Sequence, residues 1–417
     1  MSPAQPEGIA WPSDGALDAA LAEPDSGRPL SLYVHVPFCS VRCGYCDFNT
    51  YTVGFGEGAE PGSYAATIGA EAELAARVLA GASWAQRSAS TVFIGGGTPT
   101  LLDAAELGEI LSRLRDVIGI DEDAEVTIEA NPDTVDARIL EALAEAGATR
   151  ISFGMQSAVP EVLRTLDRTH DPARVPEVVA AAKAAGLAAS VDLIYGTPGE
   201  SLDDWRRSLD AVLDMEPGHV SAYALVVEEG TRMGAAVARG ELPTPDPDDE
   251  AAKYEAADAA LGGAGYRWYE ISNFAKPGPG EEGVPAHELA RASRHNLAYW
   301  RDHDWWGFGP GAHSHVGRYR WWNVKHPGAH AGRLRAGLSP AAAGEVLDEE
   351  SRALERVMLA VRTSQGIGID EVPEPRAVAG LIADGLVDPA AALRGRILLT
   401  LRGRLLADRA TRELMGF

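Results

Sequence analysis

Tyr33-Val-His-Val-Pro-Phe-Cys39-Ser-Val-Arg-Cys43-Gly-Tyr-Cys46 contains all three cysteines of the 417-residue chain. An odd number of cysteines crowded into eight residues cannot form a disulfide framework, so metal or redox chemistry is the better interpretation. The β-rich run Leu32–Val36 predicts a strand that leads directly into this cysteine loop.

The spacing of the three cysteines favours an iron–sulfur cluster. Cys39-x3-Cys43-x2-Cys46 places three thiolates on a tight loop, and soft thiolates are the usual ligands of such clusters. A missing fourth ligand leaves one iron open to chelate the amino and carboxylate groups of S-adenosylmethionine (SAM), and Tyr45 can pack over that ligand. Structural zinc with His35 as fourth ligand is the alternative, although zinc sites usually bring two spaced ligand pairs.

Strand and helix patterns alternate on both sides of this loop. Alanine-rich stretches of helical periodicity separate six β-rich runs, and Ser201 with Asp204 marks one helix start. This order predicts an α/β fold with parallel strands and right-handed crossovers, either a partial barrel or an open wound sheet. The predicted strands are Leu32–Val36, Val92–Gly95, Glu125–Ala130, Arg150–Phe153, Ala188–Tyr195 and His219–Leu225.

Unusual residues gather where these strands end. The run Gly95-Gly96-Gly97 follows the second strand, Glu129 ends the third, Gln156 follows the fourth and Asp192 lies in the fifth. Because barrel chemistry sits at the C-terminal ends of the strands, we expect one active site there. The glycines can let backbone amides approach a ligand, or simply form a tight turn, and Glu129 can bind ribose hydroxyls or cap the next helix.

Four motifs in order point to a family. The cysteine motif resembles the radical SAM superfamily, and three further stretches resemble its oxygen-independent coproporphyrinogen III oxidase family: Gly95-Gly-Gly-Thr-Pro-Thr100, Glu129-Ala-Asn-Pro132 and Asp192-Leu-Ile-Tyr-Gly196. The resemblance covers about residues 31–417. It implies a partial (βα)6 barrel and a [4Fe–4S] cluster on Cys39, Cys43 and Cys46. It also implies SAM contacts from Tyr33, Gly96, Gly97, Thr98, Glu129, Gln156, Arg168 and Asp192, although Arg168 can equally be an exposed helix residue.

Two departures separate the chain from that oxidase and indicate a subfamily. The oxidase carries a further cysteine where this chain has Phe48, and its substrate-binding N-terminal arm has no counterpart here. Three other motifs look like the HemW subfamily of heme chaperones: Tyr269-Glu-Ile-Ser-Asn-Phe-Ala275, His295-Asn-Leu-Ala-Tyr-Trp300 and Gly307-Phe-Gly-Pro-Gly-Ala-His-Ser314.

The HemW resemblance implies heme as a further cofactor and heme-accepting proteins as partners. It makes His295 the expected heme ligand, with Tyr299 and Trp300 offering flat apolar faces to a porphyrin. Two alternatives stay open. The His-Asn pair can be a hydrogen-bonded core element, and His303, His313 and His315 compete as ligands.

Three functions follow from these observations. A SAM-binding iron–sulfur heme chaperone is the leading hypothesis, a porphyrinogen decarboxylase of porphyrin biosynthesis is the second, and whether the chain is an enzyme stays open. A radical SAM enzyme that modifies RNA is the third, but the net charge of −24 opposes nucleic-acid binding.

The chain divides by composition into four parts. We expect a flexible segment over 1–30, the barrel over 31–265, a His- and Trp-rich connecting region with the heme site over 266–345, and a small α+β, winged-helix-like module over 346–417. The module is expected to consist of helices followed by two short strands around Arg402-Gly403, and residues 276–292 are expected to form a mobile loop.

Without a membrane-span pattern or signal peptide, we expect a cytoplasmic location. The family suggests homodimers, and membrane-associated hemoproteins are conceivable acceptors.

Overall fold

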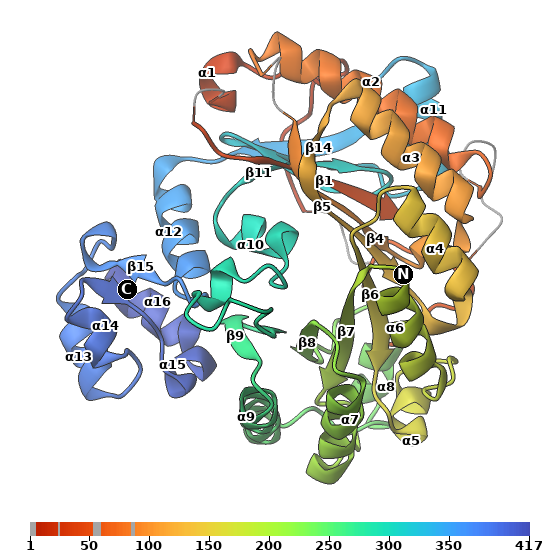
Figure 1. The fold of residues 1–417 in the computed structure, drawn as a ribbon. Helices are drawn as coiled ribbons and strands as arrows, with labels where there is room; N and C mark the ends of the chain where they lie inside the picture. Colours follow the sequence, from red (N-terminus) through yellow and green to blue (C-terminus); the bar gives the residue numbers. More distant parts are fainter. Residues whose placement is uncertain (1–5, 24–25, 53–59, 85–87) are drawn as a thin grey trace.

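Six parallel strands form the centre of the computed structural model, which describes residues 6–23, 26–52, 60–84 and 88–417 (Figure 1). Each run predicted to be a strand is one, and the strands pair in chain order, which confirms the α/β partial barrel. Among the described residues the two ends of the sheet do not pair, so the barrel stays open. The parallel strands are β1 (Leu30–Val36), β4 (Ala89–Gly96), β5 (Ile120–Ala130), β6 (Arg150–Gln156), β7 (Ala188–Tyr195) and β8 (His219–Ala224).

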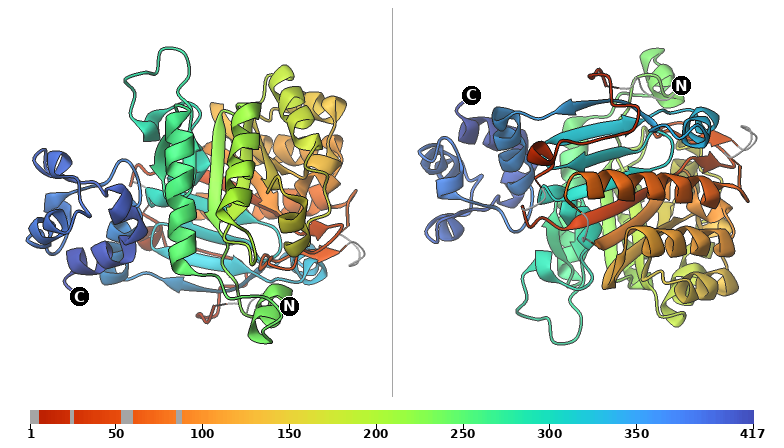
Figure 2. Two further views of the ribbon diagram at one scale, coloured as in Figure 1. Left: turned by 90° about the horizontal axis from the view of Figure 1, so that it is seen from below. Right: turned by 90° about the horizontal axis from the view of Figure 1, so that it is seen from above.

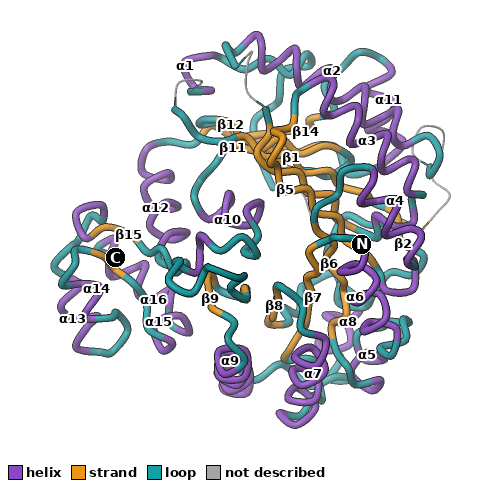
Figure 3. Tube along the Cα trace, viewed as in Figure 1, coloured by secondary structure: helices purple, strands orange, loops and turns teal. Residues whose placement is uncertain are grey.

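Helices cover the outer, convex face of the sheet (Figure 3). Each one packs an apolar side against the strands, as Trp205, Leu209 and Val212 of α7 illustrate. The predicted helix start at Ser201 is confirmed, because its hydroxyl accepts from the Asp204 amide and the Asp204 carboxylate accepts from the Ser201 amide. The covering helices are α2 (Tyr64–Gly81), α3 (Ala104–Val117), α4 (Ala137–Glu145), α6 (Arg174–Ala184), α7 (Leu202–Met215) and α9 (Pro247–Gly263). Two further helices, α5 (Pro160–Thr165) and α8 (Arg232–Ala238), lie beside the cysteine loop, where the Gly44 amide donates to Leu166 and the Met233 amide donates to Gly44.

The His- and Trp-rich region extends the same sheet at both ends instead of connecting two parts. Beyond β8 lie β10 (Asn273–Ala275) and β9 (Arg267–Glu270), and beyond β1 lie β11 (Asp304–Phe308), β12 (His313–Val316), β13 (Tyr319–Asn323) and β14 (Ala341–Val346). Helix α10 (Arg294–Trp300) lies between these two groups of strands, on the concave side of the sheet (Figure 1). The chain therefore crosses the open side of the barrel at α10.

The described part of the N-terminal segment, which we expected to be flexible, packs on this extension. The Trp11 ring stacks on Trp321 with centroids 5.3 Å apart, and Ile9 forms a bridge with Gly344. Glycine is required at 344, because a Cβ there would come within 2.3 Å of the Trp11 ring. The short helix α1 (Ala19–Ala22) follows, while residues 1–5 and 24–25 lie outside the described residues.

The C-terminal module has an apolar core of its own and lies to one side of the barrel (Figure 2). Its strand pair, β15 (Ile367–Gly368) with β16 (Arg396–Ile397), comes earlier than predicted. The predicted strands around Arg402 are wrong: this segment is a helix, because the Thr400 hydroxyl accepts from the Gly403 amide and caps its start. The helices are α12 (Glu349–Ala360), α13 (Ala377–Ala383), α14 (Pro389–Ala392), α15 (Leu401–Leu405) and α16 (Ala407–Met415).

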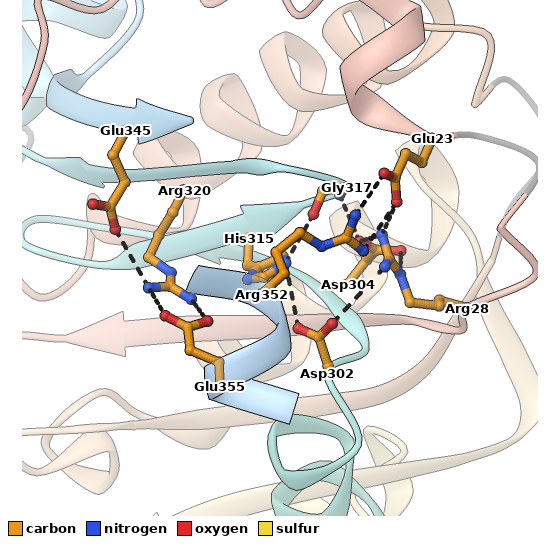
Figure 4. A network of polar contacts seen from close by, with 10 residues as sticks. All are labelled: Glu23, Arg28, Asp302, Asp304, His315, Gly317, Arg320, Glu345, Arg352 and Glu355. Atoms are coloured by element: carbon orange, nitrogen blue, oxygen red, sulfur yellow. Dashed lines mark hydrogen bonds and ion pairs between the residues drawn. The ribbon is translucent and has the colours of Figure 1, made fainter. Parts of the chain in front are cut away.

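A network of charged groups joins α12 to the sheet and to the N-terminal segment (Figure 4). Arg320 on β13 lies 2.7 Å from Glu355 of α12, and Arg352 of α12 lies 2.8 Å from Glu23. Arg28 connects Glu23 to the buried carboxylate of Asp304 at the start of β11. The network therefore fixes the first helix of the module against the barrel. In the described part of the chain, no helix is long and apolar enough to span a membrane.

Candidate cluster and cargo site

The three cysteines lie on the loop that follows β1. Cys39 ends the two-residue strand β2 (Phe38–Cys39), which pairs with β3 (Tyr51–Thr52), and all three thiols are free. Cys39 is buried, whereas Cys43 and Cys46 are half-buried. Burial raises the pKa of the Cys39 thiol to about 11. Binding of a metal must therefore displace a firmly held proton, as thiolate coordination does.

The glycine turn after β4 packs directly against the cysteine loop. Gly96 has φ +116°, and a Cβ on Gly97 would lie 2.4 Å from the Phe38 carbonyl oxygen and 2.9 Å from Cys39 Sγ. The Thr98 amide donates to the same carbonyl at 2.8 Å. Only glycine lets the backbone come this close, which gives the predicted turn a specific reason beside the cysteines.

Two buried carboxylates complete the rim. Glu129 accepts a hydrogen bond from the Gly96 amide at 2.9 Å, and Asp192 accepts one from Ser152 at 2.8 Å. Burial, with the nearby charge of Asp192, raises the pKa of Glu129 to about 7. Burial likewise raises the pKa of Asp192 above its usual range. Both carboxyl groups therefore hold a proton more readily than usual, and each can exchange hydrogen bonds with the hydroxyls of a ligand.

Arg168 also reaches the cysteines and is largely buried, unlike an exposed helix residue. Its Nη2 donates to the Gly154 carbonyl at 2.6 Å, and its Nη1 lies 3.9 Å from Cys43 Sγ. Gln156 adopts φ +64° at the end of β6, a backbone conformation that few residues other than glycine adopt.

All but one of the residues predicted to bind the cluster or SAM share one hollow of about 170 Å³, here called the cluster pocket. It is lined by Cys39, Cys43, Cys46, Gly96, Gly97, Thr98, Glu129, Gln156, Arg168 and Asp192, together with Tyr45 and Asn131. Three thiols beside a glycine cradle and buried acceptors fit an iron–sulfur cluster that carries SAM. His35 is not available as a zinc ligand, because its two ring nitrogens contact the Tyr33 hydroxyl and the Asn49 carbonyl, each at 2.9 Å.

A larger hollow of about 540 Å³, here called the aromatic cavity, adjoins the cluster pocket. Glu129, Ser152, Gln156 and Asp192 line both spaces. Tyr33, the remaining predicted SAM residue, lies here rather than in the cluster pocket. The side chains that give the cavity its aromatic character are Tyr33, Tyr45, Phe48, Phe93, Tyr223 and Tyr299.

His295 lines the aromatic cavity but is only 1% exposed, with both ring nitrogens in hydrogen bonds. Nδ1 lies 2.8 Å from the Thr91 hydroxyl, and Nε2 lies 2.9 Å from the Tyr299 hydroxyl. The ring stacks on Phe93 with centroids 5.1 Å apart, and burial lowers its pKa to about 4. His295 is therefore a neutral, fully hydrogen-bonded imidazole in this conformation, which is the geometry of the core alternative.

The competing histidines lie elsewhere. Of the described histidines, only His219 and His295 line the aromatic cavity, and His303, His313 and His315 do not. His315 Nε2 contacts the Gly317 carbonyl at 3.0 Å, and the His313 ring lies against Trp322. His219 and His295 are therefore the described histidines that lie beside the aromatic cavity.

The two HemW-like motifs around β9 and α10 contact each other. Tyr269 accepts at its hydroxyl from the Ser293 amide at 3.2 Å, and the Glu270 carboxylate accepts from Asn296 at 2.6 Å. These contacts hold α10 across the cavity.

Glu125 and Arg150 were not identified as site residues from the sequence, yet they hold the start of α10. Glu125 Oε1 accepts from the His295 amide at 3.0 Å, and Oε2 pairs with Arg150 Nη2 at 3.0 Å. The only available signal was an acidic residue inside a predicted buried strand, where a charge requires a partner.

Comparisons with known proteins agree with this geometry. Residues 33–212 match the family described as the radical SAM superfamily. The chain is 46% identical over 396 residues to "Heme chaperone HemW" of Mycobacterium tuberculosis strain H37Rv, which covers 94% of this chain and 96% of that protein. It is also 33% identical over 397 residues to "Heme chaperone HemW" of Bacillus subtilis, and that alignment covers 93% of this chain and 99% of the relative.

Among solved structures, coproporphyrinogen III oxidase (HemN) from Escherichia coli, a radical SAM enzyme, superposes with a TM-score of 0.77. The alignment covers 97% of this chain and 96% of that one at 23% identity, and so shows a shared fold. The full-length sequence similarity identifies the family: the chain belongs to the HemW family, within the radical SAM superfamily.

Proposed function

We propose that the chain is a heme chaperone that binds heme in the aromatic cavity and passes it to heme-accepting proteins. The observation that carries this proposal is the cavity itself. Its volume of about 540 Å³ falls within the roughly 300–1,000 Å³ typical of small-molecule sites, and six aromatic side chains line its walls. Aromatic rings suit a flat, apolar macrocycle. The names of the two HemW relatives support the same cargo.

The cluster pocket supplies the second binding function. Cys39, Cys43 and Cys46 would hold three irons of a [4Fe–4S] cluster. The backbone of Gly96 and Gly97 would lie along the methionine part of SAM, with Glu129 as an acceptor for ribose hydroxyls. Bound SAM and a reduced cluster together supply radical chemistry. In a chaperone, binding of the cluster and SAM in the cluster pocket would instead affect heme binding in the aromatic cavity, because Glu129, Gln156 and Asp192 line both spaces.

The mouth of the aromatic cavity carries three exposed side chains of mainly apolar character, which suits a site that must release its cargo. Phe48 is 54% exposed, Tyr223 44% and Val226 64%, and all three line the aromatic cavity. Exposed apolar groups that gather at one opening mark a site of ligand or partner contact. We propose that acceptor proteins dock at this mouth.

Porphyrinogen decarboxylation is the second candidate. Glu129, Gln156 and Asp192 face both the cluster pocket and the cavity, so a cofactor in one hollow would meet a substrate in the other. Phe48 opposes this reading, because the oxidase family carries a cysteine at the position. RNA modification is disfavoured, since Asp47 and Glu228 line the cavity and would repel a phosphate backbone.

One anaerobic experiment separates the first two candidates. Protein reconstituted with its cluster is supplied in parallel with heme, and with coproporphyrinogen III plus SAM and reductant. The chaperone predicts one tightly bound heme per chain and no protoporphyrinogen. Multiple turnovers to protoporphyrinogen would replace the proposal with the oxidase, and a failure to bind heme would remove the chaperone.

The remaining proposals concern setting and assembly. We propose a cytoplasmic protein that forms homodimers and has membrane-associated hemoproteins among its acceptors. Light scattering on the purified protein with and without heme tests the dimer, and a monomer at all concentrations would reject it. Fractionation of cells tests the location, and recovery outside the cytoplasm would reject it. Expression of residues 346–417 alone tests whether the module is an independent domain.

A further inference from the structure

A hollow of about 410 Å³, here called the basic pocket, lies where β6, β7 and β8 begin, with Arg150, Ala188 and Gly218 in its wall. The cysteine loop, the glycine turn and the rim carboxylates lie at the other ends of the strands, so the two sites are on opposite edges of the sheet. Of the described residues that line the basic pocket, none lines the cluster pocket and only Arg150 lines the aromatic cavity. Its charged residues are Arg150, Lys183, Glu216, Lys276 and Arg291.

Four cations around one carboxylate run against the composition of a chain that has 61 acidic and 37 basic residues. Two of these cations contact neutral oxygens instead of carboxylates. Lys183 Nζ donates to the Met215 carbonyl at 2.8 Å, and Arg291 Nη1 lies 3.5 Å from the Pro277 carbonyl. In the described part of the chain, neither Lys183 nor Arg291 lies within ion-pair distance of a carboxylate. Both therefore bring an uncompensated charge to the pocket.

The other two cations can also donate to a ligand. Arg150 is 4% exposed and uses Nη2 on Glu125 and Nη1 on the Arg291 carbonyl, but its Nε has no partner among the described residues. A buried donor of this kind calls for an acceptor. Lys276 lies 3.1 Å from Glu216, whose side chain is 70% exposed. Because such an exposed ion pair contributes little, an incoming anion can take the place of Glu216.

The surroundings of Glu216 indicate what kind of group fits here. Lys276, through a hydrogen bond and its charge, and to a smaller extent Lys183 hold the pKa of the Glu216 carboxyl below its ordinary value. An anion is therefore stabilised between these two lysines. Two uncompensated cations match a group with about two negative charges, and a phosphate group on an organic molecule carries about −1.5 to −2 at neutral pH. The arginine fork also suits phosphate oxygens.

The size of the pocket leaves room for more than the phosphate. Its volume of about 410 Å³ lies in the range of small-molecule sites, and residues 187–189, a leucine and two alanines, form the wall between the charged groups. This wall offers apolar contacts to a small organic part.

We propose that the basic pocket binds the phosphate group of a small metabolite, with its four cations as the hydrogen-bond donors. Free inorganic phosphate presents the same chemistry, and the experiment below separates the two sources. The inference does not rest on the proposed function, because Lys183, Lys276 and Arg291 line neither the cluster pocket nor the aromatic cavity. Binding makes and breaks no covalent bond.

The test is anaerobic isothermal titration calorimetry of the full-length, cluster-containing protein in phosphate-free buffer, with saturating SAM to keep the cluster pocket filled. The probes are phenyl phosphate and orthophosphate. We expect one saturable site per chain that weakens as salt is added, because the pocket is open to solvent. Tighter binding of phenyl phosphate identifies a phosphate ester as the ligand, and equal affinities identify inorganic phosphate.

Variants of the exposed charges locate the site. Lys276→Gln and Arg291→Gln should each weaken phosphate binding about tenfold, since each removes a charged hydrogen bond. Glu216→Gln should tighten binding, because it removes the competing carboxylate. Arg206→Gln, on the exposed face of α7, is the matched control for loss of one positive charge and should leave the affinity unchanged.

Circular dichroism checks the fold of each variant. Absence of saturable phosphate binding by the wild type would overturn the proposal. It would also be overturned by unchanged affinity in both Lys276→Gln and Arg291→Gln, or by weaker binding in Glu216→Gln. Phosphate binding that occurs only without SAM would place the ligand in the cluster pocket and overturn the assignment as well.

Discussion

Replacement of Glu125 by alanine removes the carboxylate that fixes the start of α10. Glu125 and Arg150 are 5% and 4% exposed, and their charges are 3.0 Å apart. Removal of one partner from a buried pair costs about 3–5 kcal/mol, because the other charge stays buried. Loss of the amides' acceptor at the helix start costs about 1 kcal/mol more. We therefore expect Glu125→Ala to lower the free energy of unfolding by about 4–6 kcal/mol.

Chemical denaturation of the cluster-free protein, followed by circular dichroism, measures this loss. The double variant Glu125→Ala with Arg150→Met is the matched control, since an apolar pair in place of a buried ion pair is often close to neutral. It should recover most of the stability lost by Glu125→Ala, although the uncapped helix start remains. Heme titration of both variants then reports whether α10 still holds Tyr299 and His295 in place.

The pH dependence of the wild type checks the same pair. Although burial opposes it, Arg150 and the amides of α10 hold the pKa of Glu125 below its ordinary value. A depressed acid pKa stabilises the protein above the unfolded-state value and this contribution is lost as the pH falls through the folded-state value. A Glu125→Ala protein within 1 kcal/mol of the wild type at neutral pH would refute the reasoning.

Three further predictions concern the cluster pocket. Cys43→Ala should lose the cluster's iron, sulfide and brown absorption while circular dichroism stays unchanged; full cluster content would reject the ligand assignment. Gly97→Ala should reduce cluster content, because the new Cβ would meet the Phe38 carbonyl at 2.4 Å and Cys39 Sγ at 2.9 Å, and normal iron content would contradict that clash. Burial raises the pKa of Glu129 to about 7, so the folded protein holds the carboxyl proton more tightly than the unfolded chain, in which the pKa is 4.5. The stabilisation that comes from this difference is complete below pH 4.5 and is lost as the pH rises through 7. Denaturation of cluster-free Glu129→Gln over this range should show a flatter profile than the wild type, and identical profiles would exclude Glu129 as the cause.

The sequence predicted the parts of the fold that depend on local pattern. The six parallel strands, the cysteine loop and the glycine turn all follow from periodicity and motif order. The part played by residues 266–345 was not predictable in this way. Strands β11 to β14 join the sheet through pairing with β1, about 270 residues away in the chain, and no local pattern reports such pairing.

The N-terminal segment and the C-terminal strands show the same limit. Trp11 packs on Trp321 in a contact that composition cannot reveal, because Ala, Pro and Gly around it suggest a loose chain. The basic stretch at Arg402 has strand-like residues, but the Thr400 cap and the approach of Gly403 to Leu386 favour a helix. Tertiary contacts decide these segments.

For the site, the sequence identified ten residues that line the cluster pocket, but not the polar groups that orient His295. Thr91 and Glu125 lie inside strands, where alternation in the sequence suggests only burial. Their role depends on α10, which follows them by about 170–200 residues. The hydrogen bond between His295 and Tyr299 could have been suspected, since residues four apart on a helix lie on one face.

The most direct test of heme binding in the aromatic cavity is the position of its iron. Anaerobic crystals of the heme-loaded, cluster-containing protein give an anomalous difference map at the iron absorption edge. The account predicts one peak at Cys39, Cys43 and Cys46, and a separate peak in the aromatic cavity beside Tyr299. A heme iron on the outer surface, or at any site remote from the cavity, would contradict it.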